Sequence, residues 1–351
     1  MTQAFEPPRC PNRRCPMHRA PGPRFYQCRG SYRPACRAEP VPRFRCKHCR
    51  RGFSRQTFRL DYRDRKPEFN GPLFQLLIGG SSLRQSARTL CLGVHTVQYK
   101  FRKLARGLRL LNRNLLVQLP ADRSYLLDEL ETFEQRSICP LTVPVLIEKS
   151  SYAVIATAVA PIRRVARRGS RRQRWLARYE SVHGRRPDRS RDCVRKVLAR
   201  WRRLLGGNQG VLITDQKALY ASLCRSLLPG QVEHVTVSGK LARTPFNPLF
   251  PINMTDSMLR DNNGRLRRRS WLVSKRARCL TLQLEMYAAY RNWHRPRTNR
   301  GDKALTPGVH LGVVARRLKI AELLAWRQDW RERSIHPASS SGSESIRQWV
   351  A

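Results

Sequence analysis

Two aspartates, Asp128 and Asp215, lie in short apolar segments with the composition of buried β-strands. Asp128 is flanked by leucines in the segment 125–133 (YLLDELETF), and Asp215 follows the run VLIT just before a helical pattern at 217–228. Burying an unpaired charge is costly, so each carboxylate needs a hydrogen-bond partner, an opposite charge or a metal ion. Two such carboxylates in a very basic chain predict a divalent-cation site that acts on nucleic acid.

A second set of candidate ligands consists of four cysteines near the N-terminus. Cys10 and Cys15 form one pair, and Cys46 and Cys49 form another, about thirty residues further along the chain. Four thiolates on two tight turns suit tetrahedral zinc, and a segment with so few apolar residues needs a metal ion to fold. We therefore expect a structural zinc site in a zinc-ribbon-like module over residues 1–60.

The spacing leaves alternatives open for this module. Further potential ligands lie in the same segment, namely Cys28, Cys36, His18 and His48. A basic arm without fixed structure that carries incidental cysteines is the competing interpretation. The chain has eleven cysteines, an odd number, and several stand singly in helical patterns, which favours a reducing cytoplasm over a disulfide framework.

The overall charge indicates the class of partner. The 351 residues include 70 Lys and Arg against 24 Asp and Glu, a formal net charge of +46. A compact fold with this excess repels itself unless a polyanion neutralises it, so nucleic acid is the expected partner. A membrane surface is the weaker alternative, because there is no apolar run of about 18 residues and no secretion-signal pattern at the start.

Residues 67–118 have the pattern of a helix-turn-helix. Helical patterns over 69–78 and 83–90 are separated by a Gly-Gly-Ser-Ser sequence, and a longer one runs over 95–111 after a turn at 91–94. In such motifs the start of the last helix meets base edges, and basic residues contact phosphates. The expected DNA-binding residues are Arg84, Arg88, His95, Thr96, Gln98, Tyr99, Arg102 and Lys103. The same pattern places Lys100 on the exposed side and Cys91 in the core, and a plain basic helical hairpin is the alternative.

Residues 120–295 predict an α/β domain. Apolar runs at 125–133, 141–147 and 152–160 indicate an antiparallel meander, in which Pro144 would force a bulge or an edge position. An arginine-rich insertion at 163–190 is expected to lie against a DNA backbone. A helix at 192–205, the Asp215 strand with its helix and a strand at 231–237 follow. This element order describes a ribonuclease-H-like mixed sheet.

Taken together, these segments resemble the transposases of the bacterial insertion-sequence-one family, of the Asp-Asp-Glu type. The resemblance rests on the zinc knuckles and on LRQSARTL, HTVQYK, LDELETF, ITDQKALY and INMTDSMLRDNNGRLRRRSWLVSK in that order. It implies that the zinc and helix-turn-helix parts bind the terminal inverted repeats of a mobile element. It also implies that the ribonuclease-H-like part cuts and rejoins double-stranded DNA with two divalent metal ions, Mg²⁺ or Mn²⁺.

The resemblance further implies where this chemistry takes place. The Asp of the family's Asp-Glu pair falls on Asp128, and the Asp of its Thr-Asp-x-x-x-Leu-Tyr stretch falls on Asp215. A homo-oligomer on element ends and target DNA is expected because two ends must be joined, and the compartment would be the bacterial cytoplasm, at the nucleoid.

The third acid departs from the family's pattern. Asn253 stands where the family has a Glu, and an asparagine carbonyl can bind Mg²⁺ but supplies no charge. Asp256, three residues later on the same helix face, is the expected third catalytic acid. Asp261 and Glu285 are the other candidates, and a capping or salt-bridging role for Asp256 is the plainer alternative.

The competing functions follow from this departure. A catalytically decayed zinc and helix-turn-helix DNA-binding protein is the first alternative, and a basic RNA- or ribosome-associated protein is the second. In the C-terminal part, residues 296–351, we expect a helix at 313–330 and a disordered Ser/Gly-rich tail at 339–345.

Overall fold

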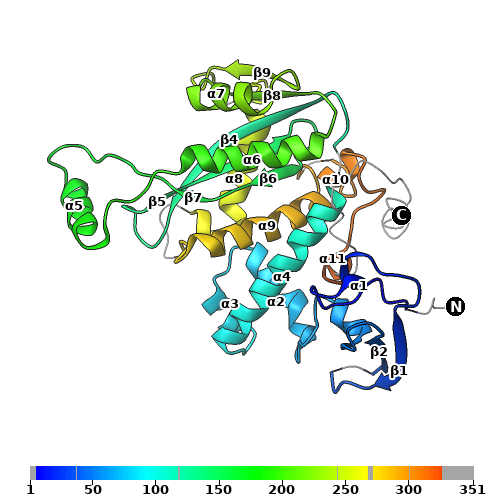
Figure 1. Cartoon of the computed structure of the whole chain (residues 1–351). Coiled ribbons are helices and arrows are strands. Elements are labelled where there is room, and N and C mark those ends of the chain that lie inside the picture. The colour runs from blue at the N-terminus through cyan, green and yellow to red at the C-terminus, as the bar shows by residue number, and fades with distance from the viewer. Residues whose placement is uncertain are drawn as a thin grey trace.

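The computed structural model describes residues 5–36, 38–117, 119–242, 244–267, 272–299 and 301–325. It is an α/β structure, in which a small antiparallel sheet at the N-terminus is followed by a group of helices and then by a larger mixed sheet (Figure 1). The predicted α/β class is therefore confirmed. Within the described residues, no helix combines the length and the apolar character needed to cross a bilayer.

The N-terminal module has a one-turn helix and three strands. Helix α1 (Pro16–Arg19) precedes β1 (Tyr26–Tyr32), β2 (Val41–Cys46) and β3 (Gly52–Ser54), which pair antiparallel in that order, and a 3₁₀ turn η1 (Arg55–Phe58) follows. Phenylalanines pack with the cysteines into a small separate core, formed by Cys10, Cys15, Phe25, Phe44, Cys46, Phe53 and Phe58. This core is small, because few other apolar residues are available to it.

Three helices follow a second 3₁₀ turn, η2 (Pro67–Phe69). They are α2 (Asn70–Ile78), α3 (Leu83–Thr89) and the long α4 (Val94–Leu115). Ser82 caps α3 by accepting a hydrogen bond from the Gln85 amide (3.1 Å), and the Gln85 side chain accepts one from the Ser82 amide (2.9 Å). The turn into α4 passes through Cys91, whose φ of 50° is left-handed and whose side chain is exposed, so the expected core position of Cys91 is wrong.

Lys100 on α4 is buried, contrary to the sequence prediction. Its side chain is only 2% exposed, and Nζ lies 2.7 Å from both carboxylate oxygens of Asp64 and 3.0 Å from Oδ1 of Asn70. Burial alone would raise the pKa of Asp64, but the hydrogen bonds from Lys100 and Asn70 lower it. Helical periodicity could not reveal this pair, because Asp64 lies 36 residues earlier in the chain.

The larger sheet has the strand order β6-β5-β4-β8-β9. Its strands are β4 (Arg123–Phe133), β5 (Pro140–Glu148), β6 (Val154–Thr157), β8 (Gly210–Asp215) and β9 (Val232–Val237), and the short β7 (Ala160–Pro161) also pairs with β5. Strand β5 is antiparallel to both β4 and β6, whereas β8 is parallel to both β4 and β9. The third strand of the predicted meander is split into β6 and β7. The break between them lies opposite Pro144 of β5, which has no amide to donate to a neighbouring strand.

Helices cover both faces of this sheet. Helices α6 (Ser190–Leu205) and α7 (Ala218–Leu227) pack on the face that carries Tyr125, Leu127 and Leu212. On the other face, Leu126, Leu130 and Ile213 pack against α8 (Phe250–Asn262), the 3₁₀ turn η3 (Gly264–Leu266) and α9 (Ala277–Trp293). Residues next to each other on β4 and β8 therefore point into different layers.

Helix α9 also connects the sheet to the helical group. Its Asn292 and Trp293 side chains both donate to Oδ1 of the buried Asn112 on α4, at 3.1 and 3.0 Å. Two short helices, α10 (Pro307–His310) and α11 (Ile320–Ala325), complete the described chain. The prediction of a helix at 313–330 is therefore wrong in extent, because within the described residues the helix begins only at Ile320. The predicted tail at 339–345 lies outside the described residues.

The buried Lys100–Asp64 pair generates a stability prediction. Lys100→Met should lower the free energy of unfolding by about 3–5 kcal/mol, because it leaves the Asp64 carboxylate buried without its cation. Arg106→Met on the exposed side of the same helix is the matched control, with an expected change within about 0.5 kcal/mol. Urea unfolding followed by circular dichroism measures both, and equal losses in the two variants would contradict the prediction.

Candidate metal centres

The four predicted cysteines meet in one cluster. Within the described part of the chain, they are the one group of three or more Cys, His or acidic side chains whose ligand atoms all lie within 4.8 Å of one another. The Sγ atoms of Cys10 and Cys49 are 3.5 Å apart, and those of Cys15 and Cys46 are 3.9 Å apart. Sulfurs bound at about 2.3 Å to a tetrahedral zinc ion would be about 3.8 Å apart, so the cluster has the dimensions of a structural zinc site.

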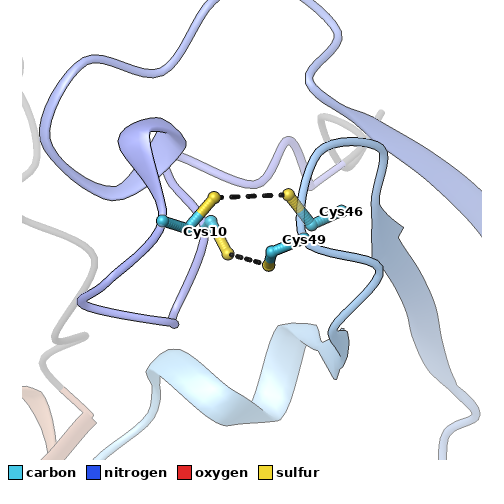
Figure 2. Close-up of side chains that lie close together, drawn as sticks. Cys10, Cys46 and Cys49 are labelled. Atoms are coloured by element: carbon cyan, nitrogen blue, oxygen red, sulfur yellow. Dashed lines mark hydrogen bonds between the residues drawn. The ribbon is translucent and has the colours of Figure 1, made fainter.

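Two loops bring these thiols together, as Figure 2 shows for Cys10, Cys46 and Cys49. In the first loop the Cys15 amide donates to the carbonyl of Asn12 (3.0 Å), and in the second the Arg50 amide donates to the carbonyl of Cys46 (3.0 Å). Such tight turns direct both thiols of a pair to the same side.

The charge on the thiols depends on their surroundings. Burial raises the pKa of Cys10 and Cys15, so a bound cation would have to provide the charge that keeps them as thiolates. Burial also acts on Cys49, but hydrogen bonds from the Arg51 amide and the Asn12 side chain outweigh it and lower the pKa of Cys49 to about 7. Cys49 therefore ionises more readily near neutral pH than Cys10 and Cys15 do.

The other potential ligands lie apart from this cluster or beside it. The Nδ1 atom of His18 lies 2.7 Å from the carbonyl oxygen of Cys10, so His18 contacts the main chain of the loop. Nδ1 of His48 is 3.8 Å from Sγ of Cys15, while Cys28 is exposed and Sγ of Cys36 lies 3.7 Å from the carbonyl of Asp64. The geometry therefore favours a ligand set of four sulfurs.

Removal of the metal ion generates the second prediction. Cys46→Ser should bind less zinc than the intact chain, and its residues 5–60 should exchange their amide hydrogens faster, because the aromatic core alone is small. The exposed Cys28→Ser is the matched control and should keep one zinc ion per chain. Metal analysis with hydrogen exchange measures both properties, and a zinc-free chain with unchanged protection would contradict a structural role.

The predicted carboxylates lie on one face of the larger sheet. Asp128 is in β4 and Asp215 ends the neighbouring parallel strand β8, where Leu126 is paired with Ile213. Two residues further along, both strands reach their aspartates, on the same side as Leu126 and Ile213. The two carboxylates are close enough for Asp215 to contribute to a raised pKa of Asp128, of which burial is the larger cause.

Asp256 approaches the same place from α8. Its helix packs on this face through Ile252 and Leu259, and Asp256 lies between them on the buried side, 6% exposed. Its Oδ1 atom is buried without a hydrogen-bond partner. Burial and the nearby Asp128 carboxylate raise the pKa of Asp256 well above the ordinary value. These are the features expected of an acid that is to be neutralised by a bound cation.

The spacing of the three carboxylates limits how they could bind a metal ion. They are not among the side chains whose ligand atoms all lie within 4.8 Å of one another in the described residues. The cluster is therefore wider than the thiol site. Mg²⁺ usually keeps several waters and binds proteins through one or two carboxylates together with substrate phosphates, which suits an open group of this kind.

The remaining candidates for the third acid have other neighbours. The Glu285 carboxylate lies 3.8 Å from the Arg200 guanidinium, so it pairs with α6 in the other helical layer. Asp261 lies at the end of α8, where its carbonyl accepts from Arg267 (2.9 Å). Asn253 is on the first turn of α8, and its carbonyl accepts from Ser257 (3.0 Å). Asp256 is the acid that α8 brings toward Asp128.

The predicted DNA-binding side chains lie on α3 and α4. Arg84, Arg88, His95, Thr96 and Arg102 are exposed, and Tyr99 is 52% exposed. Gln98 is half-buried, and Lys103 is half-buried with its ammonium donating to the carbonyl of Tyr62. The start of α4 thus presents polar and basic groups to solvent, whereas Lys103 is already engaged.

The arginine-rich insertion contains a helix that the sequence analysis did not predict. Helix α5 (Arg171–His183) has no buried residue and lies at one end of the molecule, away from the N-terminal module (Figure 1). An ion pair between Arg163 and Glu180 (3.1 Å) anchors it. The signal that was missed is Ser170, whose hydroxyl caps the helix by accepting from the Gln173 amide (3.2 Å).

One neighbour of the carboxylate site, Glu129, was not predicted from the sequence. Glu129, directly after Asp128, accepts hydrogen bonds from Thr142 (2.7 Å) and Tyr220 (3.0 Å) and pairs with Lys217. The signal was available in ITDQKALY, because Lys217 and Tyr220 lie three residues apart in the segment predicted as a helix, a spacing that brings side chains together.

No protein-family model matches this chain, and no curated protein matches it either. Its function must therefore be argued from its own residues.

The raised pKa of Asp256 generates the third prediction. A carboxyl group whose pKa is higher in the folded than in the unfolded chain costs stability at pH values above its unfolded pKa, about 3.9, and costs nothing well below it. Asp256→Asn should therefore raise the melting temperature of the chain, without added divalent cation, by about 2–4 °C at pH 7, and the gain should shrink toward pH 4.

The matched control is Asp192→Asn, an exposed acid on the first turn of α6 that pairs with Arg195 (3.2 Å). Its melting temperature should stay close to that of the intact chain at both pH values. Calorimetry at pH 4 and pH 7 measures the difference, and a lower melting temperature for Asp256→Asn at pH 7 would contradict the argument.

Proposed function

We propose that this protein is a DNA transposase of the Asp-Asp-Glu type that binds the ends of a mobile element and catalyses metal-dependent DNA strand cleavage and strand transfer. The observation that carries the proposal is the convergence of Asp128, Asp215 and the buried Asp256 on one face of the larger sheet. The resemblance of the sequence to the insertion-sequence-one family supports the same activity.

The sheet topology supports a ribonuclease-H-like catalytic domain. Strands β4, β5 and β6 and the short β7 are followed by α5 and α6, by β8 parallel to β4, by α7 and by the parallel strand β9. In this arrangement β4 and β8 are neighbours, and each carries one of the proposed acids. We infer that Asp128, Asp215 and Asp256 hold Mg²⁺ or Mn²⁺, which would supply Lewis-acid stabilisation of the reacting phosphate when bound.

The chain's own residues have distinct roles in this proposal. Asp128 and Asp215 present their carboxylates from rigid strands, so the cation site has a fixed position relative to the DNA. Asp256 tends to keep its proton without a cation, because burial and Asp128 raise its pKa, and it would lose that proton when a cation binds.

Two surfaces would bind DNA. Helices α3 and α4 are proposed as a helix-turn-helix that recognises the terminal inverted repeats, with Thr96, Gln98 and Tyr99 toward base edges and Arg84, Arg88 and Arg102 toward phosphates. Helix α5 presents Arg171, Arg172, Arg174 and Arg178 and would contact the DNA backbone without sequence preference. The net charge of +46 supports both assignments.

The second candidate function is that of a DNA-binding protein with a decayed catalytic domain. Asn253 favours it, because the acid expected at that position is missing. It would keep the zinc module and the helix-turn-helix but cleave no DNA. A transposase must join two DNA ends, so a homo-oligomer on DNA is expected for the transposase. The DNA-binding protein does not require one.

Cleavage of a labelled duplex is the fourth prediction and tests the proposed function. The duplex carries the terminal inverted repeat of the element that encodes the protein, and Mg²⁺ or Mn²⁺ is added. Asp128→Asn, Asp215→Asn and Asp256→Asn should each lower the nicking rate by at least about 100-fold, because each removes a charge from the cation site.

Binding of the same duplex, measured without divalent cations, separates the candidate functions. The three variants should bind as tightly as the intact protein, and the exposed Asp192→Asn should nick at the intact rate. Tight binding without nicking by the intact protein would establish the decayed protein instead. Nicking that survives in Asp256→Asn alone would remove Asp256 from the site.

A further inference from the structure

Glu129 lies next to Asp128 in β4 but on the opposite face of the sheet. Odd-numbered residues of this strand, such as Leu127, point toward α6 and α7, whereas Leu126 and Leu130 point toward α8 and α9. The Glu129 side chain is only 8% exposed, and its Oε1 accepts a hydrogen bond from the Thr142 hydroxyl on β5 at 2.7 Å. Glu129 is thus held between two strands, behind the carboxylate cluster.

The other oxygen of Glu129 binds the segment that follows β8. Oε2 accepts a hydrogen bond from the hydroxyl of Tyr220 at 3.0 Å and pairs with the ammonium group of Lys217. Burial raises the pKa of the Tyr220 hydroxyl, which therefore remains a hydrogen-bond donor. The main-chain amide of Lys217 in turn donates to Oδ1 of Asp215 at 3.1 Å. One residue, Lys217, therefore contacts both Glu129 and Asp215.

These contacts matter because the main-chain pairing of β4 with β8 ends too early to hold Asp215. The last paired residues are Leu126 and Ile213, two positions before the aspartates. Beyond that point β8 is paired only with β9 among the described strands, through Asp215 and Val237. The side chain of Glu129 connects β4 to the segment after β8 where these two strands are no longer paired with each other.

We propose that Glu129 is a positioning residue, which anchors the turn after β8 through Lys217 and Tyr220 and so holds the Asp215 carboxylate beside Asp128. Its importance for catalysis rests on the proposed function, but its effect on the turn does not. Glu129 does not ligate the cation, because both of its oxygens are engaged on the opposite face of the sheet from Asp128.

The turn is tested first, by hydrogen exchange of the zinc-loaded full-length protein without DNA or added divalent cation. In Glu129→Gln and in Lys217→Met, the amides of residues 216–218 should exchange about tenfold faster than in the intact chain, because a charge-assisted contact is lost. The double variant should exchange no faster than either single one. Lys217→Arg, which keeps the cation, should restore most of the protection.

The matched control is Glu131→Gln, two residues further on the same strand and on the same face. Its carboxylate pairs with Arg164 and not with Lys217 or Tyr220, so exchange at 216–218 should be unchanged. Unchanged exchange in Glu129→Gln, or the same increase in Glu131→Gln, would overturn the proposal.

The consequence for the cation site is tested by titration with Mn²⁺, whose free concentration is followed by electron paramagnetic resonance. Glu129→Gln should raise the half-saturating Mn²⁺ concentration about tenfold without abolishing binding, whereas Asp128→Asn should abolish it. Complete loss in Glu129→Gln would make Glu129 a ligand and overturn its positioning role. If the intact chain shows no binding that depends on Asp128, the proposed function fails, and the exchange result still decides the role of Glu129.

Discussion

The buried carboxylate of Asp256, which faces the Asp128 carboxylate, is the constraint on which the candidate site depends. The packing of α8 on the sheet buries Asp256, and burial together with the charge of Asp128 raises the pKa of Asp256, while burial and Asp215 raise the pKa of Asp128. An apolar side chain at position 256 would satisfy the packing of α8 equally well. The fold therefore tolerates a local cost that only a bound cation, or a proton, can remove.

The rest of the larger domain keeps these carboxylates in place. The parallel pairing of β4 with β8 sets their register, and α9 holds the second face through an apolar layer. Because α9 is also joined to α4 by the Asn112 hydrogen bonds, the carboxylate face and the exposed start of α4 belong to one packed body. Under the proposed function, this connection would fix the position of DNA bound at α4 relative to the three carboxylates.

The N-terminal module follows a different principle. Its aromatic core is small, and its two cysteine loops approach each other closely enough for one tetrahedral ion. The buried ion pair between Lys100 and Asp64 holds the segment that follows this module against α4. This ion pair adds to an apolar contact, because Leu60 of the same segment is buried in one core with Phe101 and Leu104 of α4. A buried pair of this kind specifies one arrangement more than it adds stability.

The sequence by itself determined the elements whose signals are local. Cysteine spacing located the thiol cluster, apolar β-branched runs located β4, β5 and β8, and the serine cap located α3. It also singled out Asp128 and Asp215, since acids in apolar segments stand out in any window, whereas Asp256 was named through the family resemblance and its offset from Asn253. These signals require only neighbouring residues, so they do not depend on how the chain folds over longer distances.

The tertiary structure alone decided which of these residues meet. The burial of Lys100, the pairing of Glu285 with Arg200 and the contact of Glu129 with Lys217 join residues that lie 36, 85 and 88 positions apart. Strand alternation predicts that Asp128 and Glu129 face opposite ways, but it does not say which layer each one enters. Side-chain charge is a property of each residue alone, whereas burial and pairing depend on packing between distant segments. The carboxylates of the proposed cation site could therefore be named from the sequence, but their arrangement could not be predicted from it.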